Sequence, residues 1–406
     1  MRSCKICGNG IEKFMSFGRM PLGNGFLTPD LFEREYFFEL APAFCERCSA
    51  FQIVEHPDPG KMFHAEYAFF SQTSRAMAAH FETFANSVMA DWLNANDPFV
   101  VELGSNDGIM LRHFAARNIR HLGIEPSANV AEAARVQGVR TLTAFFSAEI
   151  ARAIVRDHGQ ADAILAANVL CHIPDLNSVA EGFAALLKPD GVVVFEDPYL
   201  GEVVRQTSYD QIYDEHIFLF SALSVSRAFA PHGLELIAVA PQKTHGGSMR
   251  YVLARTGRRA AEPSIGRQLV LERELGLANP GTYDRFRLNC EKSRRDLMAA
   301  LDDLAAKGRR VVGYGATSKS TTVINYCGIT PRQVEFISDT TPTKQEKFSP
   351  GAHIPVRPYQ EFVARYPDVA LLFAWNHAEE IFAKEGAFRA AGGRWLTFVP
   401  TVKFVT

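Results

Sequence analysis

Four of the seven cysteines form two short pairs near the amino terminus, and these pairs constrain the fold more than any other feature. The pairs are Cys4-x-x-Cys7 and Cys45-x-x-Cys48. Each can offer two sulfurs to one metal ion, and two such pairs match a tetrahedral four-thiolate zinc site. Four thiolates leave no open coordination position, so we predict a structural zinc in a loop-rich module over residues 1–70. The alternative is two unrelated buried or redox-active pairs.

Charge and hydropathy argue against several other classes of protein. The 406 residues carry 43 basic and 45 acidic side chains, a balance that gives no global basic surface for nucleic acid or an anionic membrane. No apolar run approaches the roughly 18 residues that span a bilayer, and the chain begins without a signal-peptide pattern. We therefore expect a cytoplasmic protein with reduced thiols and with neither a nucleic-acid nor a membrane partner.

Strand and helix patterns alternate along the rest of the chain, which predicts an α/β fold with a parallel sheet and helices on both faces. A helical pattern covers 74–93. The first set has strands at 99–103, 121–125, 141–144, 161–167 and 191–196, with helices at 109–116 and 128–137. Breaks near 256–264 and a charged helical region separate it from strands at 311–315, 334–338, 369–375 and 395–399. We predict two α/β domains, 71–255 and a smaller one at 256–406.

A glycine-bearing turn follows the first predicted strand, at the sheet edge where open α/β folds bind ligands. The turn is Gly104-Ser-Asn-Asp-Gly108, with Glu102 inside the preceding strand, and Glu125 lies 21 residues after Gly104. A carboxylate at that place can hold both hydroxyls of a ribose. A dinucleotide fold would prefer G-x-G-x-x-G, whereas this pattern resembles the class I (Rossmann-like) S-adenosylmethionine-dependent methyltransferases. The alternative is an ordinary strand–turn–helix.

That resemblance implies where the cofactor lies. The first loop would face its methionine part and Glu125 its ribose. The loop after the fourth strand would carry Asn168 beside the methionine and the transferred methyl, while Phe146 and Ser147 would line the adenine. The candidate cofactor-binding residues are Glu102, Gly104, Ser105, Asn106, Glu125, Phe146, Ser147 and Asn168. His172 lies in the same loop, either with a chemical role or without one.

The segment 209–221 combines tyrosines, a carboxylate and a histidine beyond the fifth strand. Within it, Tyr213, Glu215 and His216 fall in four consecutive positions. Histidine has an ordinary pKa near 6.5 and can act as a base close to neutral pH. Tyrosine hydroxyls can donate hydrogen bonds to a developing oxyanion. We favour chemistry here over the alternative, a capping cluster before the helix that begins at Ser221.

Two further motifs have weaker signals. The stretch Thr244-His245-Gly-Gly-Ser-Met-Arg250 is either a hairpin or a site that brings backbone donors and Arg250 to an anion. Gly313-Tyr314-Gly315-Ala-Thr-Ser-Lys319 follows a strand and opens a helix, which suits a diphosphate. Asp339, 24 residues beyond Gly315, keeps a nicotinamide-dependent oxidoreductase open as an alternative.

In this order the motifs resemble those of the zinc-containing deoxysugar C-methyltransferases, which methylate a nucleotide-linked 4-keto sugar. The likeness covers nearly the whole chain: the zinc module, the cofactor domain and the carboxyl-terminal α/β domain. Its most distinctive match is Tyr213-Asp-Glu215-His216, supported by the His-Gly-Gly-Ser stretch at His245 and by Gly-Tyr-Gly-Ala at Gly313.

The resemblance implies a mechanism and a substrate. A base removes the proton next to the ketone, and the enolate carbon attacks the sulfonium methyl. His216 would be the base, Tyr213 and Glu215 would organise it or the substrate, and Tyr67 and His172 would line the sugar pocket with Tyr213. His245, Arg250, Tyr314 and Lys319 would contact a dTDP- or GDP-linked 4-keto-deoxysugar.

Methylation at C3 is favoured over C5. Three alternatives to this function remain open: an O- or N-methyltransferase, the oxidoreductase, and a zinc-bearing RNA-modifying or binding protein.

Overall fold

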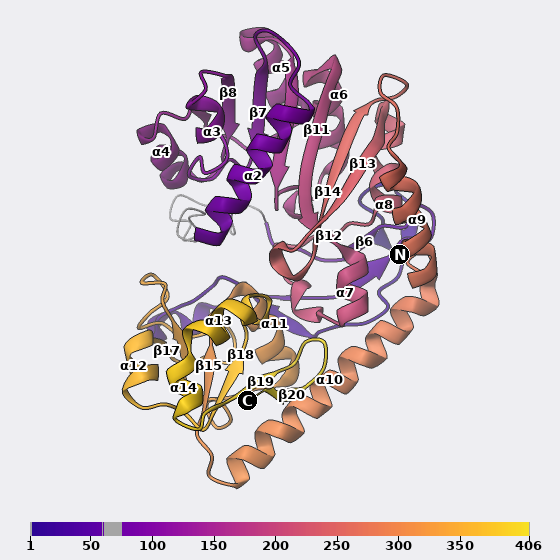
Figure 1. Ribbon diagram of the computed structural model, residues 1–406. Helices are drawn as coiled ribbons and strands as arrows, with labels where there is room; N and C mark the ends of the chain where they lie inside the picture. Colours follow the sequence, from indigo (N-terminus) through magenta and orange to yellow (C-terminus); the bar gives the residue numbers. More distant parts are fainter. Residues whose placement is uncertain (1, 59, 61–74, 406) are drawn as a thin grey trace.

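The computed structural model describes residues 2–58, 60 and 75–405, which fold into three parts (Figure 1). In Figure 1 the central sheet and its helices lie above and the carboxyl-terminal domain lies below. Helix α10 (Pro280–Ala306) joins these two parts along one side of the molecule. The amino-terminal module contributes hydrogen bonds to both of them, as described below.

The amino-terminal module consists of short antiparallel pairs connected by loops. Its strands are β1 (Arg2–Ser3), β2 (Gly10–Ile11), β3 (Arg19–Pro21), β4 (Phe37–Glu39), β5 (Pro42–Phe44) and β6 (Phe51–Ile53), with a 3-10 helix η1 (Pro29–Arg34). Strand β6 pairs with β5 and also with β12 (Phe218–Leu219), which lies in the predicted segment 209–221 just after His216. This pairing fixes the residues after His216 against the zinc module.

The central domain is built on a seven-stranded sheet in the order β13-β14-β11-β10-β7-β8-β9. Its strands are β7 (Phe99–Leu103), β8 (Arg120–Ile124), β9 (Thr141–Leu142), β10 (Ala161–Ala167), β11 (Leu187–Pro198), β13 (Leu234–Gln242) and β14 (Ser248–Arg255). The five predicted strands pair in parallel, but β14 is antiparallel to both neighbours. Only residues 243–247 separate β13 from β14, too short a link for a parallel crossover.

Helices cover both faces of this sheet, as predicted. They are α2 (Arg75–Asp91), α3 (Arg112–Ala115), α4 (Ala128–Val136), α5 (Ala148–His158), α6 (Leu176–Leu186), α7 (Leu200–Gln206) and α8 (Ala222–Phe229), with 3-10 turns η3 (Leu170–His172), η4 (Tyr209–Gln211), η5 (Ala230–His232) and η6 (Thr244–Gly246). Successive residues of β7 face opposite cores: Val100 packs with Phe84 of α2, and Val101 shares a core with Phe183 of α6.

Helix α3 is shorter than the predicted 109–116. Residues Ile109 to Leu111 form buried turns, and the regular helix begins at Arg112.

The carboxyl-terminal domain has a six-stranded sheet in the order β17-β16-β15-β18-β19-β20, parallel except for the last pair. Its strands are β15 (Val311–Tyr314), β16 (Ile337–Asp339), β17 (Val356–Pro358), β18 (Val369–Leu372), β19 (Arg394–Thr397) and β20 (Lys403–Val405). Its helices are α11 (Ser318–Cys327), α12 (Tyr359–Ala364), α13 (Ala378–Lys384) and α14 (Gly386–Ala390), with η7 (Trp375–His377). Helix α9 (Pro263–Leu275) precedes α10 and packs against β13 and α8 of the central domain (Figure 1). Among the described residues, none of the helices combines the length and apolar character needed to cross a membrane.

Candidate active site

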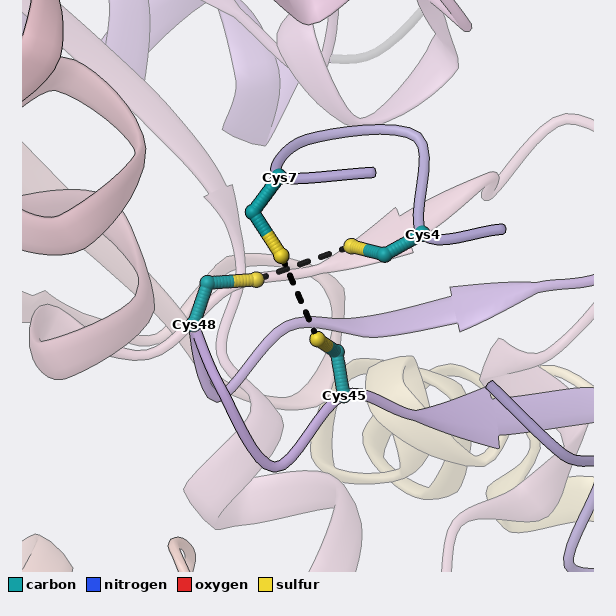
Figure 2. A group of neighbouring side chains, drawn as sticks. All are labelled: Cys4, Cys7, Cys45 and Cys48. Atoms are coloured by element: carbon teal, nitrogen blue, oxygen red, sulfur yellow. Dashed lines mark hydrogen bonds between the residues drawn. The ribbon is translucent and has the colours of Figure 1, made fainter. Parts of the chain in front are cut away.

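The four paired cysteines meet in one cluster, and Figure 2 shows their sulfurs directed toward a common centre. The Sγ atoms of Cys4 and Cys48 are 3.6 Å apart, and those of Cys7 and Cys45 are 3.5 Å apart. Sulfurs each about 2.3 Å from one zinc ion would be separated by about 3.8 Å in a tetrahedron. The residues present therefore fit a structural zinc. Gln52 Nε2 also donates to Cys4 Sγ at 3.1 Å, an outer contact of the kind that orients metal ligands.

A cavity of about 700 Å³ lies where the three parts of the chain meet. It takes residues from the central sheet, from the zinc module and from the carboxyl-terminal domain. Thirteen of the predicted site residues line it: Glu102, Gly104, Ser105, Asn106, Glu125, Phe146, Asn168, His172, Tyr213, Glu215, His216, His245 and Lys319. Most of the predicted cofactor and catalytic residues thus line one cavity.

The turn after β7 requires glycine. Gly104 has a φ of +58°, and a Cβ atom there would lie 2.4 Å from Val169 Cγ2. Glu125, at the end of β8, accepts hydrogen bonds from the backbone amides of Asn106 at 3.0 Å and Ser127 at 2.9 Å. These two bonds lock the carboxylate beside the turn, because each carboxyl oxygen has one fixed donor and retains further acceptor capacity.

The cofactor side of the cavity is acidic and contains polar atoms without protein partners. Asn168 Oδ1 and Glu102 Oε2 are buried and find no hydrogen-bond partner among the described residues. Burial raises the pKa of Glu102 well above its usual range, and the charges of Glu125 and Asp107 raise it further. A cationic group would relieve this crowding of acids. S-adenosylmethionine carries an ammonium and a sulfonium, so the residues present fit it.

The predicted adenine contacts are divided between two roles. Phe146 lines the cavity, whereas Ser147 caps helix α5 through a hydrogen bond from Ile150 N to its Oγ. Phe145 also lines the cavity, and its large apolar side chain is 51% exposed. The sequence prediction did not include this residue. An exposed aromatic ring at this rim is suited to stack on a flat base.

The hydrogen bonds of His216 fix its tautomer. Its Nδ1 lies 2.7 Å from the Gln211 carbonyl oxygen, which can only accept, so Nδ1 carries the proton. The other nitrogen, Nε2, is then the acceptor in a 3.0 Å hydrogen bond from the Tyr213 hydroxyl. The imidazole thus presents a lone pair on Nε2 with a phenol directed at it, which is the state required of a general base.

Burial keeps the cavity histidines uncharged near neutral pH. It lowers the pKa of His216 well below its usual range, with nearby His172 lowering it further. Burial also lowers the pKa of His172 to about 4, and the ring of His172 stacks on His216 with centroids 5.4 Å apart. Burial and then the charge of Lys319 lower the pKa of His245 to about 3. Each imidazole is therefore available as a hydrogen-bond acceptor.

The opposite side of the cavity is basic. Lys319, at the start of α11, is buried and donates from Nζ to the His245 carbonyl oxygen at 3.4 Å. Lys344 follows β16 and donates from Nζ to the Ala316 carbonyl at 2.8 Å. Thr317, Ser318, Asn376 and His377 complete this wall. The helix amino terminus and the two ammonium groups suit an anionic ligand.

Two predicted substrate contacts have other partners. Arg250 lies outside the described cavity wall: it pairs with Glu196 at 3.0 Å and covers the Phe84 ring. Tyr314 also falls outside that wall and donates to Glu385 at 2.7 Å. Both are structural contacts here, because a neighbouring buried carboxylate satisfies each polar group. Tyr67 lies outside the described residues.

Asp339 bears on the nicotinamide alternative. Its two carboxyl oxygens accept from the amides of Ala316 and Thr341, each at 2.7 Å, and Lys344 occupies the adjoining space. A ribose at this position would compete with the ammonium group of Lys344. The surroundings of Asp339 therefore suit a nicotinamide cofactor poorly. The Gly104 turn suits S-adenosylmethionine better.

Sequence reasoning missed two polar residues in the cavity wall, Asn24 and Lys344. Asn24 belongs to the zinc module and donates from Nδ2 to Glu215 Oε1 at 2.7 Å. Lys344 lies five residues after the acid that ends β16, and its place beyond a predicted strand end is the only signal that could have drawn attention to it.

Family models match all three parts of the chain. Residues 4–63 match a zinc binding domain, residues 69–239 a methyltransferase domain, and residues 243–400 a C-methyltransferase C-terminal domain. Along the chain, the three matches have the same order as the amino-terminal module, the central domain and the carboxyl-terminal domain. They support the predicted combination of structural zinc and S-adenosylmethionine.

Individual relatives agree with the family models. The chain is 32% identical to the C-methyltransferase NovU of Streptomyces niveus over 99% of its own length and 96% of that protein's. It is 29% identical to the ubiquinone biosynthesis O-methyltransferase of Ralstonia nicotianae over 27% of its length and 49% of that protein's. Among solved structures, it is similar to the magnesium protoporphyrin IX methyltransferase of Synechocystis with bound S-adenosylmethionine. That match has a TM-score of 0.34 and 12% identity, and covers 44% of this chain and 79% of the other.

Proposed function

Because the chain belongs to the family of zinc-containing deoxysugar C-methyltransferases, we propose that it methylates a carbon beside the ketone of a nucleotide-diphosphate-linked 4-keto-deoxysugar. It is an S-adenosylmethionine-dependent C-methyltransferase. The sugar, its linkage to a nucleotide and the choice of C3 over C5 are the proposed part. We also propose a cytoplasmic location. This suits the cysteines, because none of the seven forms a disulfide.

The observation that carries the proposal is that His216 lines the same cavity as two regions of opposite charge. The acidic turn around Gly104 fits a cationic methyl donor, and the wall with Lys319 and Lys344 fits the phosphates of an anionic acceptor. His216 lies in the same cavity with an unprotonated Nε2. A carbon acid held there would meet a base on one side and the methyl group on another.

The protein's part in the reaction is to move one proton and stabilise one charge. His216 Nε2 takes the proton from the carbon next to the ketone, while its Nδ1–H stays bonded to the Gln211 carbonyl and supports the resulting imidazolium. Tyr213 is released from Nε2 as substrate engages it, and its hydroxyl donates to the enolate oxygen. Bound S-adenosylmethionine supplies the electrophilic methyl group to the carbon of the enolate.

Enclosure protects this intermediate from water. His216, Glu215 and Tyr213 are each less than 10% exposed, and residues from all three parts of the chain surround them. An enolate formed in an open site would be reprotonated by solvent before methyl transfer. The buried His216–Tyr213 pair supplies the base and the hydrogen-bond donor that C-methylation beside a ketone requires.

The test is product analysis with a panel of dTDP- and GDP-linked 4-keto-deoxysugars and S-adenosylmethionine. We expect mass spectrometry to detect one added methyl group on one nucleotide sugar, and carbon–hydrogen correlation spectra to place it on C3. A methyl group found on oxygen or nitrogen would contradict the proposal, as would a purely nicotinamide-dependent change in the same panel.

A further inference from the structure

The loop at Gly23 and Asn24, in the zinc module, reaches into the predicted catalytic segment. Gly23 N donates to Asp214 Oδ1 at 2.9 Å, and Asn24 Nδ2 donates to Glu215 Oε1 at 2.7 Å. On its other side, Gly23 accepts through its carbonyl from Thr321 Oγ1 of helix α11 at 2.9 Å. One loop thus connects the zinc module, the catalytic segment and the carboxyl-terminal domain.

The close approach of this loop depends on glycine. A Cβ atom on Gly23 would lie 2.8 Å from Asp214 Oδ1 and 3.3 Å from both Tyr213 Cδ2 and Ser318 Cβ. Since Asp214 and Tyr213 are buried and have little room to move, a side chain at Gly23 would push Asn24 away from Glu215. The backbone is therefore built to bring this particular amide into the cavity wall.

Glu215 is a buried carboxyl with few groups to hold its charge. Burial raises its pKa, while the hydrogen bond from Asn24 and then the charge of Lys344 lower it. Its neighbour Asp214 is also buried, and burial followed by the charge of Glu215 raises the pKa of Asp214 to about 8. These groups share one small volume, so losing the amide donor would favour protonation of Glu215.

We propose that Asn24 is a positioning residue of the methyl-transfer site, holding Glu215 as an oriented carboxylate toward the acceptor. The zinc module then takes part in turnover through this amide, in addition to any contribution to folding. The inference rests on the proposed function, because it assigns Asn24 a role in the reaction at His216.

Two variants remove the donor in different ways. Asn24→Ala deletes the amide, and Asn24→Asp keeps the shape but places a second acceptor against Glu215. We expect kcat to fall about tenfold or more, as for a lost charge-assisted hydrogen bond, with affinity for S-adenosylmethionine changed by less than about twofold. The acidic limb of the kcat profile should shift to higher pH, and further in Asn24→Asp, because Glu215 then protonates more readily. Asn9→Ala, an amide lost from the same module near its surface, is the matched control.

A double-mutant cycle separates positioning from simple destabilisation. In a Glu215→Gln background the charge is gone, so Asn24→Ala should cost less than about threefold in kcat. An equal loss in both backgrounds, or a kcat within about twofold of wild type for Asn24→Ala, would overturn the inference. Zinc content and the thermal midpoint of each variant would show whether the module is intact.

The same experiments distinguish this failure from failure of the proposed function. If His216→Asn loses methyl transfer while Asn24→Ala is silent, only the role of Asn24 falls. If wild-type enzyme methylates no keto sugar on carbon, the proposed function itself falls.

Discussion

The two α/β sheets of this protein use the same local device at the edge of their first strands. In the central sheet, Glu125 accepts from the amide of Asn106 in the glycine turn and from the amide two residues beyond itself. In the carboxyl-terminal sheet, Asp339 accepts from Ala316 in its own glycine turn and from Thr341, again two residues on. Each acid thereby holds its turn in shape.

The surroundings of the two turns differ in charge. Around the first, Glu102 and Asp107 add further acids, and the turn itself forms part of the cavity wall. Around the second, Lys344 donates to the turn at Ala316, and the wall is formed by the start of α11 with Lys319. The same backbone arrangement therefore stands in an acidic setting at the first turn and a basic setting at the second, which suits the proposed cationic and anionic ligands because neighbouring side chains set the potential.

The largest expected effect comes from removing the zinc ion of the amino-terminal module, which contacts both the central and the carboxyl-terminal domains. Cys45→Ser should cost the structural zinc and destabilise the amino-terminal module, because metal binding and folding are coupled at such sites. We expect kcat to fall more than the affinity for S-adenosylmethionine, because the turn around Gly104 belongs to the central sheet and not to the zinc module. Metal analysis and calorimetry check this; freshly purified wild-type protein without zinc would contradict the metal assignment.

Exchanging the two acids for alanine tests whether only the first serves the cofactor. Glu125→Ala should weaken S-adenosylmethionine binding by at least about tenfold, because two charge-assisted bonds to a ribose are lost. Asp339→Ala is the matched control and should change that affinity by less than about twofold. If calorimetry showed equal losses of affinity in the two variants, the ribose would not bind at Glu125 alone. The two sheets would then not differ in their role toward the cofactor.

Removing the buried ammonium tests the basic side. Lys319→Gln should raise KM for the nucleotide sugar by about five- to tenfold, through loss of a charge-assisted contact to phosphate. Its kcat and the affinity for S-adenosylmethionine should change little. Lys307→Gln, at an exposed ion pair with Asp303, is the control. A Lys319→Gln enzyme with unchanged KM would show that the anion binds elsewhere.

The smallest expected effect is in the pH dependence of cofactor binding. Burial raises the pKa of Glu102 and of Glu125, so each takes up a proton at a higher pH than an exposed carboxyl does. As pH falls through these raised pKa values, negative charge facing the cation is lost and affinity should decrease. Calorimetry from slightly alkaline to mildly acidic pH measures this; a flat or rising affinity on acidification would contradict it.

The parts of the site that sequence predicted are those encoded by short spacings. Three motifs indicate a chemistry within a few residues or one strand–helix unit. They are the two cysteine pairs, the Gly104 turn with Glu125, and the Tyr213–His216 segment. Strands β7, β8 and β10 were predicted within one residue of their observed ends, because local apolar patterns terminate at turns. Strand β9 ends two residues earlier than the predicted 141–144, and β11 extends beyond the predicted 191–196 at both ends. The antiparallel pairing of β13 with β14 is the hairpin that the sequence left open as one of two interpretations of residues 244–250.

The parts that sequence did not predict depend on contacts between distant residues. Asn24 and Glu215 are 191 positions apart, and no local pattern relates them. Arg250 and Tyr314 were predicted to meet substrate because they flank glycine motifs, yet Glu196 and Glu385 satisfy them in the folded chain. A motif indicates where the backbone opens, but packing decides which side chains face the opening.

The most direct test of the central claim is the methyl-transfer rate of His216→Asn. If His216 removes the proton next to the ketone, kcat should fall by about 10²–10⁴-fold while both ligands still bind. His172→Asn, at the ring stacked on His216, should reduce the rate less severely. A His216→Asn enzyme with near-normal turnover would contradict the account and leave Tyr213 or Glu215 as the base.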